Sequence, residues 1–208
     1  MRLGVDLSEH QAGLDFSRAP LDFVVLRTTD GTYRDGAFSE HFRLSTRFQL
    51  PTSAYHYLRS PREGTTIAEQ VDAAVAVLDA AGAVGVPMWI DVESPAGLSR
   101  GDVAAAHDEF SARGIPVAGV YTTTSYWRRH MLLTSPAQFG ALWLAHWGAN
   151  PIVDLDEIAE DEPSGVIDAV AALVGTRPTA LGMPTPAMWQ CTSRALIDGV
   201  EVDLNLAF

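Results

Sequence analysis

Two acids at the end of one apolar segment are the strongest candidates for chemistry in this sequence. The segment VPMWIDVE (residues 86–93) consists mostly of β-forming residues and carries Asp91 and Glu93 near its end. Side chains two residues apart in a strand point to the same side, so Trp89, Asp91 and Glu93 share one face. Burying two carboxylates in such a strand is costly unless they find partners. The spacing alone leaves two interpretations open, namely satisfied structural acids or an acid pair of the kind that cleaves glycosidic bonds.

The elements that must position these acids alternate between short apolar strands and helices, as expected of a parallel α/β protein. Strands are expected at residues 2–8, 23–29, 52–58, 86–93, 116–122, 141–147, 186–192 and 202–207. Eight strands fit a closed barrel better than an open sheet. Catalytic groups of such barrels collect at the carboxyl ends of the strands, which is where both acids fall.

The clearest helix spans residues 66–81, with Thr66 and Glu69 as a capping box and Gly82 at its end. Further helices are expected at 37–48, from Ser99 or Asp102 to Gly114, and near 164–174. Residues 148–184 are the least regular part and contain the acidic run 154–162. A connection of that length is usually functional or mobile. We expect one catalytic barrel over residues 1–208 with an irregular insertion at 148–184.

Charge and composition exclude several classes of partner. The net charge is −12, and all 14 basic residues are arginines. Nucleic acids and anionic membranes require basic patches, so neither is expected to bind. The single cysteine, Cys191, permits no internal disulfide and fits core packing. The sequence shows no signal peptide and no apolar run near the ~20 residues of a membrane span, so we expect synthesis in the cytoplasm without membrane insertion.

Eight motifs, in order, give the sequence a resemblance to the glycoside hydrolase family 25 lysozymes, which are N-acetylmuramidases. They are GVDLSEHQ (4–11), FVVLRTTDG (23–31), AYHY (54–57), MWIDVE (88–93), GVY (119–121), LWLAHW (142–147), WQCTS (189–193) and VDLN (202–205). Each motif is weak by itself, but the order and spacing together are specific. The resemblance implies a modified TIM-like barrel of eight strands whose helices are reduced after the fifth strand.

The resemblance also implies roles for four acids. Glu93 matches the family's general acid, which must stay protonated to donate to the leaving glycosidic oxygen. Asp91 matches the second acid, which in similar retaining enzymes orients the acetamido group of the substrate for attack on the anomeric carbon. Asp6 and Asp203 match two further acids on the first and last strands, which are neighbours in a closed barrel. Direct attack by Asp91, or inversion through a water molecule, stays open at the sequence level.

Several aromatic and amide side chains near strand ends are candidates for sugar binding, because aromatic rings stack on sugar faces and amides bond to hydroxyls. These candidates are Tyr55, Tyr57, Tyr121, Trp147, Gln190 and Asn205. Tyr57 and Trp147 lie nearest the carboxyl ends of their strands and are preferred. Trp89 and Trp143 are expected in the core, and His56, of opposite parity to Tyr55 and Tyr57, is expected to be structural.

The implied function is hydrolysis of the β-1,4 bond between N-acetylmuramic acid and N-acetylglucosamine in bacterial peptidoglycan. A glycosidase acting on chitin-like polymers and a non-catalytic cell-wall sugar-binding module are the alternatives. The six histidines show no metal-binding spacing, so no metal or other cofactor is expected. A strongly acidic protein should be repelled by an anionic wall, which favours a separate wall-binding domain or electrostatic steering through counter-cations. Because no signal peptide is evident, a phage-type endolysin with holin-dependent release is the expected setting, and the catalytic part of a larger lysin is the alternative.

Overall fold

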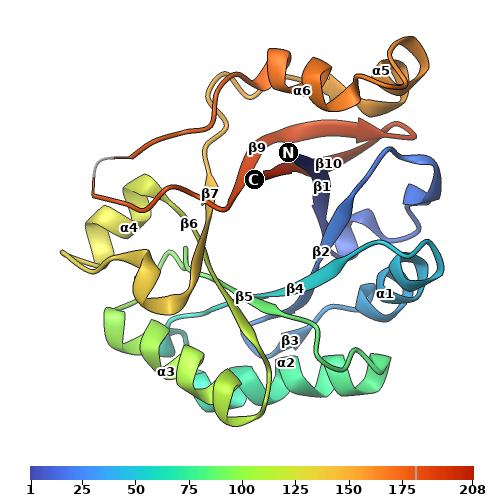
Figure 1. The fold of residues 1–208 in the computed structure, drawn as a ribbon. Coiled ribbons are helices and arrows are strands. Elements are labelled where there is room, and N and C mark those ends of the chain that lie inside the picture. The colour runs from blue at the N-terminus through green and yellow to red at the C-terminus, as the bar shows by residue number, and fades with distance from the viewer. Residues whose placement is uncertain (181) are drawn as a thin grey trace.

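The computed structural model, which describes residues 1–180 and 182–208, is a closed barrel surrounded by helices (Figure 1). Eight strands close the ring in the order β1-β10-β9-β7-β6-β5-β4-β2, because β1 pairs with both β10 and β2. These strands are β1 (Arg2–Leu7), β2 (Phe23–Asp30), β4 (Thr52–Tyr57), β5 (Met88–Asp91), β6 (Val117–Thr123), β7 (Ala141–Ala145), β9 (Met188–Ile197) and β10 (Val200–Ala207). All eight expected strands are therefore present.

The barrel is mixed rather than wholly parallel. Strand β10 runs antiparallel to both β9 and β1, whereas the other pairings in the ring are parallel. A tight turn at Asp198 and Gly199, both with positive φ, joins β9 to β10 as a hairpin. The parallel pattern expected from the sequence is wrong at this point, because a two-residue turn can only return the chain antiparallel.

Six α-helices occur in the described residues, and the first three are the most regular. Their bounds are α1 (Phe38–Arg47), α2 (Ile67–Ala81), α3 (Arg100–Ala112), α4 (Thr124–His130), α5 (Leu155–Asp161) and α6 (Val166–Val174). Helix α2 begins with the expected capping box of Thr66 and Glu69 and ends at Gly82 in the left-handed conformation. Ser99 caps α3 with Asp102 as its capping-box partner. The helices after β6 are short, as the resemblance implied.

The irregular segment 148–184 contains more structure than its sequence suggested. It holds β8 (Val153–Asp154), α5 and α6, whereas the sequence predicted only the second of these helices. Helix α5 forms from the acidic run because Asp154 caps it, accepting bonds from the backbone of Asp156 and Glu157. In Figure 1 both helices lie over the outer side of β9. Leu181, within this segment, lies outside the described residues.

Strand alternation divides the apolar residues into two clusters. Met88, Ile90 and Val92 of the acid strand belong to the larger cluster between barrel and helices. Trp89, on the other face, belongs to a smaller cluster inside the barrel with Tyr121 and Trp143. Asp91 and Glu93 continue the inward face, so the interior is aromatic below and acidic at the carboxyl ends of the strands.

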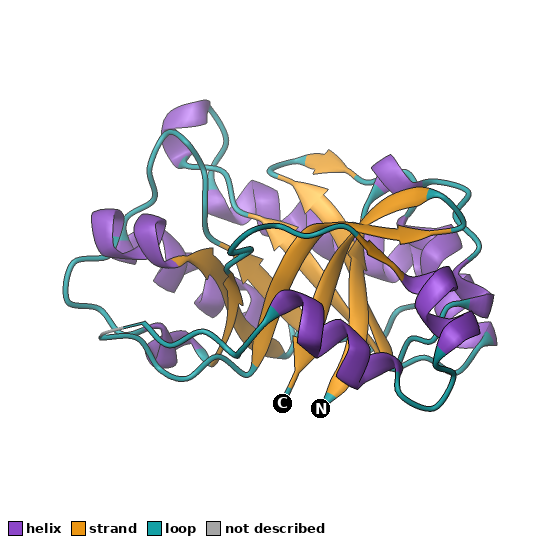
Figure 2. Cartoon of the chain, turned by 90° about the horizontal axis from the view of Figure 1, so that it is seen from above, coloured by secondary structure: helices purple, strands orange, loops and turns teal. Residues whose placement is uncertain are grey.

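The termini lie side by side at the opposite end of the barrel (Figure 2). Arg2 pairs with Ala207 in the β1–β10 ladder. A short strand, β3 (Tyr33–Arg34), extends β2 at the acidic end as a hairpin. Throughout the described chain, every helix is too short or too polar to traverse a bilayer.

Candidate active site

Four acids meet at the carboxyl ends of the barrel strands. Asp91 ends β5, and Glu93 follows two residues beyond that strand. Asp6 of β1 and Asp203 of β10 are direct partners in the antiparallel ladder, as expected for the first and last strands of a closed barrel. All four acids line one cavity of about 270 Å³. The reversal of β10 places Asp203 within its strand rather than at the end expected from the sequence.

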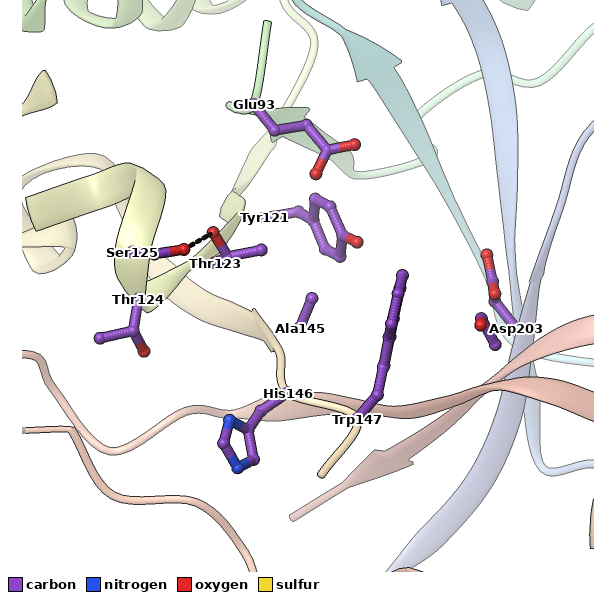
Figure 3. A pocket seen from close by; sticks show the side chains of 10 residues that line it. Glu93, Tyr121, Thr123, Thr124, Ser125, Ala145, His146, Trp147 and Asp203 are labelled. Atoms are coloured by element: carbon purple, nitrogen blue, oxygen red, sulfur yellow. Dashed lines mark hydrogen bonds between the residues drawn. The ribbon is translucent and has the colours of Figure 1, made fainter. Parts of the chain in front are cut away.

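A larger cavity of about 640 Å³ opens beside the first, and Glu93, Tyr121 and Asp203 line both. Figure 3 shows Glu93 and Asp203 on opposite sides of this opening, with the rings of Tyr121 and Trp147 between them. Trp147 is 43% exposed, which leaves its ring accessible to a ligand. A trench with acids in its floor and aromatic rings in its wall suits a sugar chain.

Burial raises the pKa of every acid in this cluster, and the charges of neighbouring acids raise the pKa values of Asp6, Asp91 and Glu93 further. Desolvation is the main cause for Glu93, and the charge of Asp203 raises the pKa of Glu93 further. Burial raises the pKa of Asp203 to about 6, although a side-chain hydrogen bond with Asp6 lowers it. The pKa values of Asp6 and Asp91 lie well above their usual range, first through burial and then through their charged neighbours. The site therefore favours protonated carboxyl groups, which a general acid requires.

The surroundings of the Asp91 side chain could not be predicted from the sequence. Its side chain is 4% exposed, yet its Oδ1 atom has no hydrogen-bond partner among the described residues. A buried polar atom without a partner is rare and costs free energy. The structural alternative for this acid, in which protein partners satisfy it, does not hold for this atom. An incoming ligand with an N–H donor would satisfy it.

Gln190 connects the acids to the aromatic wall. Its Oε1 atom accepts bonds from the Tyr121 hydroxyl and the Trp147 indole, each at 2.9 Å. Its Nε2 atom donates to Asp6 Oδ2 at 3.0 Å, and Asn205 Nδ2 donates to the same oxygen at 2.7 Å. These bonds fix the position of the Asp6 carboxylate relative to the aromatic rings of Tyr121 and Trp147.

Aromatic packing below the acids gives the site a rigid floor. The Trp143 ring lies 4.6 Å from Tyr121, 5.8 Å from Trp89 and 6.1 Å from Tyr55, measured between centroids. The Trp143 indole donates to Asn205 Oδ1 at 2.7 Å. Both tryptophans are buried, as expected, but Trp143 also lines the acidic cavity. His56 is fully buried on the other face and bonds to Thr29.

The structure brings most of the sequence-derived binding candidates to the two cavities. Tyr55, Tyr57, Tyr121 and Gln190 line the smaller cavity, and Trp147 lines the larger one. Asn205 is fully buried behind Asp6, and both of its amide atoms bond to protein groups. Gln190 is 2% exposed, and both of its side-chain amide atoms likewise bond to protein groups.

Sequence reasoning missed several residues that line these cavities. They are Thr123, Thr124, Ser125, His146 and Ser193 in the larger cavity and Arg27, Asp30 and Arg59 in the smaller one. Position was the available signal for some of them, since Thr123 ends β6 and His146 follows β7 directly. Arg59 lies 4.7 Å from the Tyr57 ring centroid and pairs with Asp30, which fixes that tyrosine at the rim.

Structural comparison finds the same fold in cell-wall hydrolases. The catalytic domain of an endolysin from a Listeria monocytogenes bacteriophage is 20% identical, with a TM-score of 0.72 over 100% of this chain and 93% of that one. A muramidase from Trichobolus zukalii is 19% identical, with a TM-score of 0.70 and coverage of 100% and 94%. The modular autolysin LytC from Streptococcus pneumoniae, solved with a synthetic peptidoglycan ligand, is 15% identical, with a TM-score of 0.67 and coverage of 100% and 46%.

At these identities the likenesses establish the fold, while the family follows from sequence. No curated protein matches the chain significantly. The family model described as "Glycosyl hydrolases family 25" matches residues 5–200, which is nearly the whole chain; the match includes Asp6, Asp91 and Glu93 and ends shortly before Asp203. This protein therefore belongs to glycosyl hydrolase family 25.

Proposed function

We propose that this protein hydrolyses bacterial peptidoglycan at the β-1,4 bond between N-acetylmuramic acid and N-acetylglucosamine. The observation that carries the proposal is the buried Oδ1 atom of Asp91, which lacks a partner beside Glu93 in an aromatic-walled trench. Membership of a glycoside hydrolase family supports the reaction class, and the muramidases among the similar structures support the substrate.

Glu93 acts as the general acid in this proposal. Its carboxyl group lies at the junction of the two cavities, where a glycosidic oxygen would be within reach. Burial and the charge of Asp203 raise its pKa, so the group retains the proton it must deliver. After the leaving sugar departs, the resulting carboxylate is the base that activates water.

Asp91 orients the substrate's acetamido group. The acetamido N–H donates to the carboxylate oxygen that has no protein partner, and the acetamido carbonyl oxygen attacks the anomeric carbon as the glycosidic bond breaks. Water then opens the cyclic intermediate, so the anomeric configuration is retained. A hydrogen bond to the ionised carboxylate also lowers the pKa of Asp91, offsetting the burial that raises it in the free protein.

The remaining candidate residues bind the substrate or hold other groups of the site in position. Asp6 and Asp203 polarise the site from the opposite strands, and Gln190 holds Asp6 against the aromatic wall. Tyr57 and Trp147, the preferred stacking residues, contact the sugar faces. Tyr55, Tyr121 and Asn205 complete the floor beneath them.

The decisive experiment measures release of reducing ends from purified peptidoglycan. Glu93→Gln removes the proton donor and is expected to lower the rate by about 10²–10⁴-fold. Glu160→Gln, on an exposed face of α5, is the matched control and should retain the wild-type rate. A Glu93→Gln protein that lyses walls at full speed would contradict the assignment. Retained wall binding without turnover in the wild type would indicate a sugar-binding module, and faster cleavage of chitin oligomers would indicate the other glycosidase.

The role of Asp91 has a separate test. Peptidoglycan whose muramic acid lacks the N-acetyl group has no attacking carbonyl, and a free amine replaces its acetamido N–H donor. We expect cleavage of this polymer to fall about as far as cleavage of intact peptidoglycan by Asp91→Asn. Equal rates on acetylated and deacetylated polymer would instead support direct attack by Asp91 or attack by water.

The biological setting proposed here is that of a phage-type endolysin acting on the wall after release from the cytoplasm. The fold likeness to a phage endolysin catalytic domain supports this setting, and the acidic charge favours a separate wall-binding domain or a holin as accessory.

A further inference from the structure

A third cavity of about 480 Å³ lies next to the acid-bearing loop and is lined by arginines. Arg62 follows β4, and Arg129 and His130 end α4. The segment 96–99, which begins three residues after Glu93, and the first turn of α3 form the other walls. This cavity shares no lining residue with the trench, and the loop that follows Glu93 is the segment that connects the two.

The two arginines of this cavity differ from five other arginines of the chain, which are held in ion pairs. Arg27, Arg43, Arg59, Arg113 and Arg194 each pair with a carboxylate. Among the ion pairs of the described residues, none includes Arg62 or Arg129, and both side chains are exposed. Arg62 Nη1 approaches the Ala96 carbonyl at 3.5 Å, which is a weak bond at most. These two guanidinium groups therefore give the cavity positive charge that no ion pair among the described residues offsets.

Asp102 is the acid that lines this cavity, and its carboxylate serves the capping of α3. Its Oδ2 atom accepts from the Ser99 backbone N–H and hydroxyl, each at 2.7 Å. The partial positive charge at the start of α3 further offsets this carboxylate. The cavity is therefore suited to an anion rather than to a cation.

The walls of the cavity are held in place by Tyr126. Its hydroxyl donates to the Ser94 carbonyl and accepts from the Leu98 backbone N–H, both at 2.9 Å. His130 stacks on the same ring, with centroids 4.4 Å apart. Gly97 has a φ of +80°, and a Cβ there would lie 3.1 Å from the His130 ring. The backbone that carries Glu93 is thus tied to the wall of this cavity.

We propose that this cavity binds a carboxylate of the peptide stem carried by the glycan strand in the trench, an inference that rests on the proposed peptidoglycan substrate. Guanidinium groups pair strongly with carboxylates, and the volume admits an amino-acid residue as well as the carboxylate itself. The stem is covalently joined to the bound sugar, so its effective concentration at the cavity is high. A phosphate polymer elsewhere in the wall lacks this tether.

The test compares two substrates made from one preparation. One is peptidoglycan with its stems, and the other is the same glycan after an amidase has removed them. The double variant Arg62→Gln/Arg129→Gln is expected to lose about tenfold in kcat/KM on stem-bearing glycan, as the loss of one charged hydrogen bond would produce, and to match the wild type on stripped glycan. Arg43→Gln controls for net charge, because it removes one positive charge from the exposed face of α1. Thermal unfolding confirms that the variants are folded.

The outcomes separate this inference from the proposed function. An equal loss on both substrates, or no loss on either, would overturn the stem site while leaving the hydrolase intact. A loss that disappears on walls freed of phosphate polymers by hydrofluoric acid would assign the cavity to those polymers instead. A wild-type protein inactive on both substrates would remove the proposed function, and this inference with it.

Discussion

Four carboxyl groups around one opening cannot all be ionised cheaply. Each charge added to the cluster raises the pKa of its neighbours, and burial raises them further. With the pKa of Asp203 at about 6, this acid is ionised at neutral pH while the pKa values of Asp6 and Asp91 lie well above their usual range. Because the charge of Asp203 raises the pKa of Glu93, an ionised Asp203 favours the protonated form of Glu93 that the proposed mechanism requires.

This arrangement predicts how the pH profile responds to one substitution. The rate should fall as pH rises through the pKa of Glu93, because the proton donor is then lost. Asp203→Asn removes a negative charge that raises this pKa, so the alkaline limb of kcat/KM should move to lower pH. The measurement is the pH dependence of reducing-end release by wild type and variant.

Asp79→Asn is the matched control, because it removes the same charge from an exposed position on α2. Its profile should superimpose on that of the wild type. A limb that stays in place in Asp203→Asn, or moves to higher pH, would show that Asp203 does not tune the acid.

At the scale of elements, the contact between β6 and β7 is the tightest point of the barrel. Gly119 has a φ of +154°, and a Cβ at this position would lie 1.9 Å from the Ala141 carbonyl oxygen. The two strands are registered at this pair of residues. Only a hydrogen atom fits between them, so the sequence requires glycine here.

Gly119→Ala is therefore expected to lower the free energy of unfolding by about 3 kcal/mol, in the range caused by overpacking in a core. Chemical denaturation of the purified variant gives this value. Gly114→Ala provides the comparison, since that glycine also has positive φ but faces open space, and the change should cost about 1 kcal/mol. Equal destabilisation by both changes would mean that backbone conformation, not strand spacing, dominates at Gly119.

Elements with local signals were predictable from the sequence, and those set by long-range pairing were not. The capping box of Thr66 and Glu69 and the alternation around Trp89 identified α2 and the inward face of β5 correctly. The antiparallel direction of β10 follows from the turn at Asp198 and Gly199, a local hairpin signal that the expected parallel pattern overlooked, whereas the pairing of β10 with β1 joins segments far apart in the sequence. Helix α5 was missed because an acidic run alone gives no apolar stripe.

The candidate site, too, was predictable from the sequence only where the signal is local or lies in the order of motifs. Strand parity placed Asp91 and Glu93 on one face, and the order of motifs identified Asp6 and Asp203. The bonds that join Gln190 to Tyr121, Trp147 and Asp6 link four strands or strand ends, and only the folded barrel brings them together. The arginines beside the Glu93 loop had no sequence signal, because Arg62 and Arg129 come from separate segments.

At the scale of the whole molecule, the net charge of −12 opposes approach to an anionic wall. Salt screens this long-range repulsion, with a Debye length of about 30 Å at 0.01 M and about 8 Å at 0.15 M. We expect kcat/KM on intact walls to rise severalfold between these ionic strengths. Lysis rates measured by turbidity across a salt series test this expectation.

A short, uncharged glycan fragment is the control, and its cleavage should change little over the same range. A rate on walls that falls with added salt would mean that attraction through local basic groups, such as those at Arg62 and Arg129, outweighs the overall repulsion.

The pairing of β1 with β10 makes the reactive centre dependent on two strands that are synthesised far apart in time. Asp6 emerges early from the ribosome, but its partner Asp203, and the hydrogen bonds from Gln190 and Asn205, arrive only with the final strands. A nascent or truncated polypeptide lacking β10 would have an open sheet and would lack Asp203, the partner of Asp6. Hydrolytic competence should therefore appear abruptly once β10 has been synthesised and paired, rather than accumulate as the polypeptide lengthens.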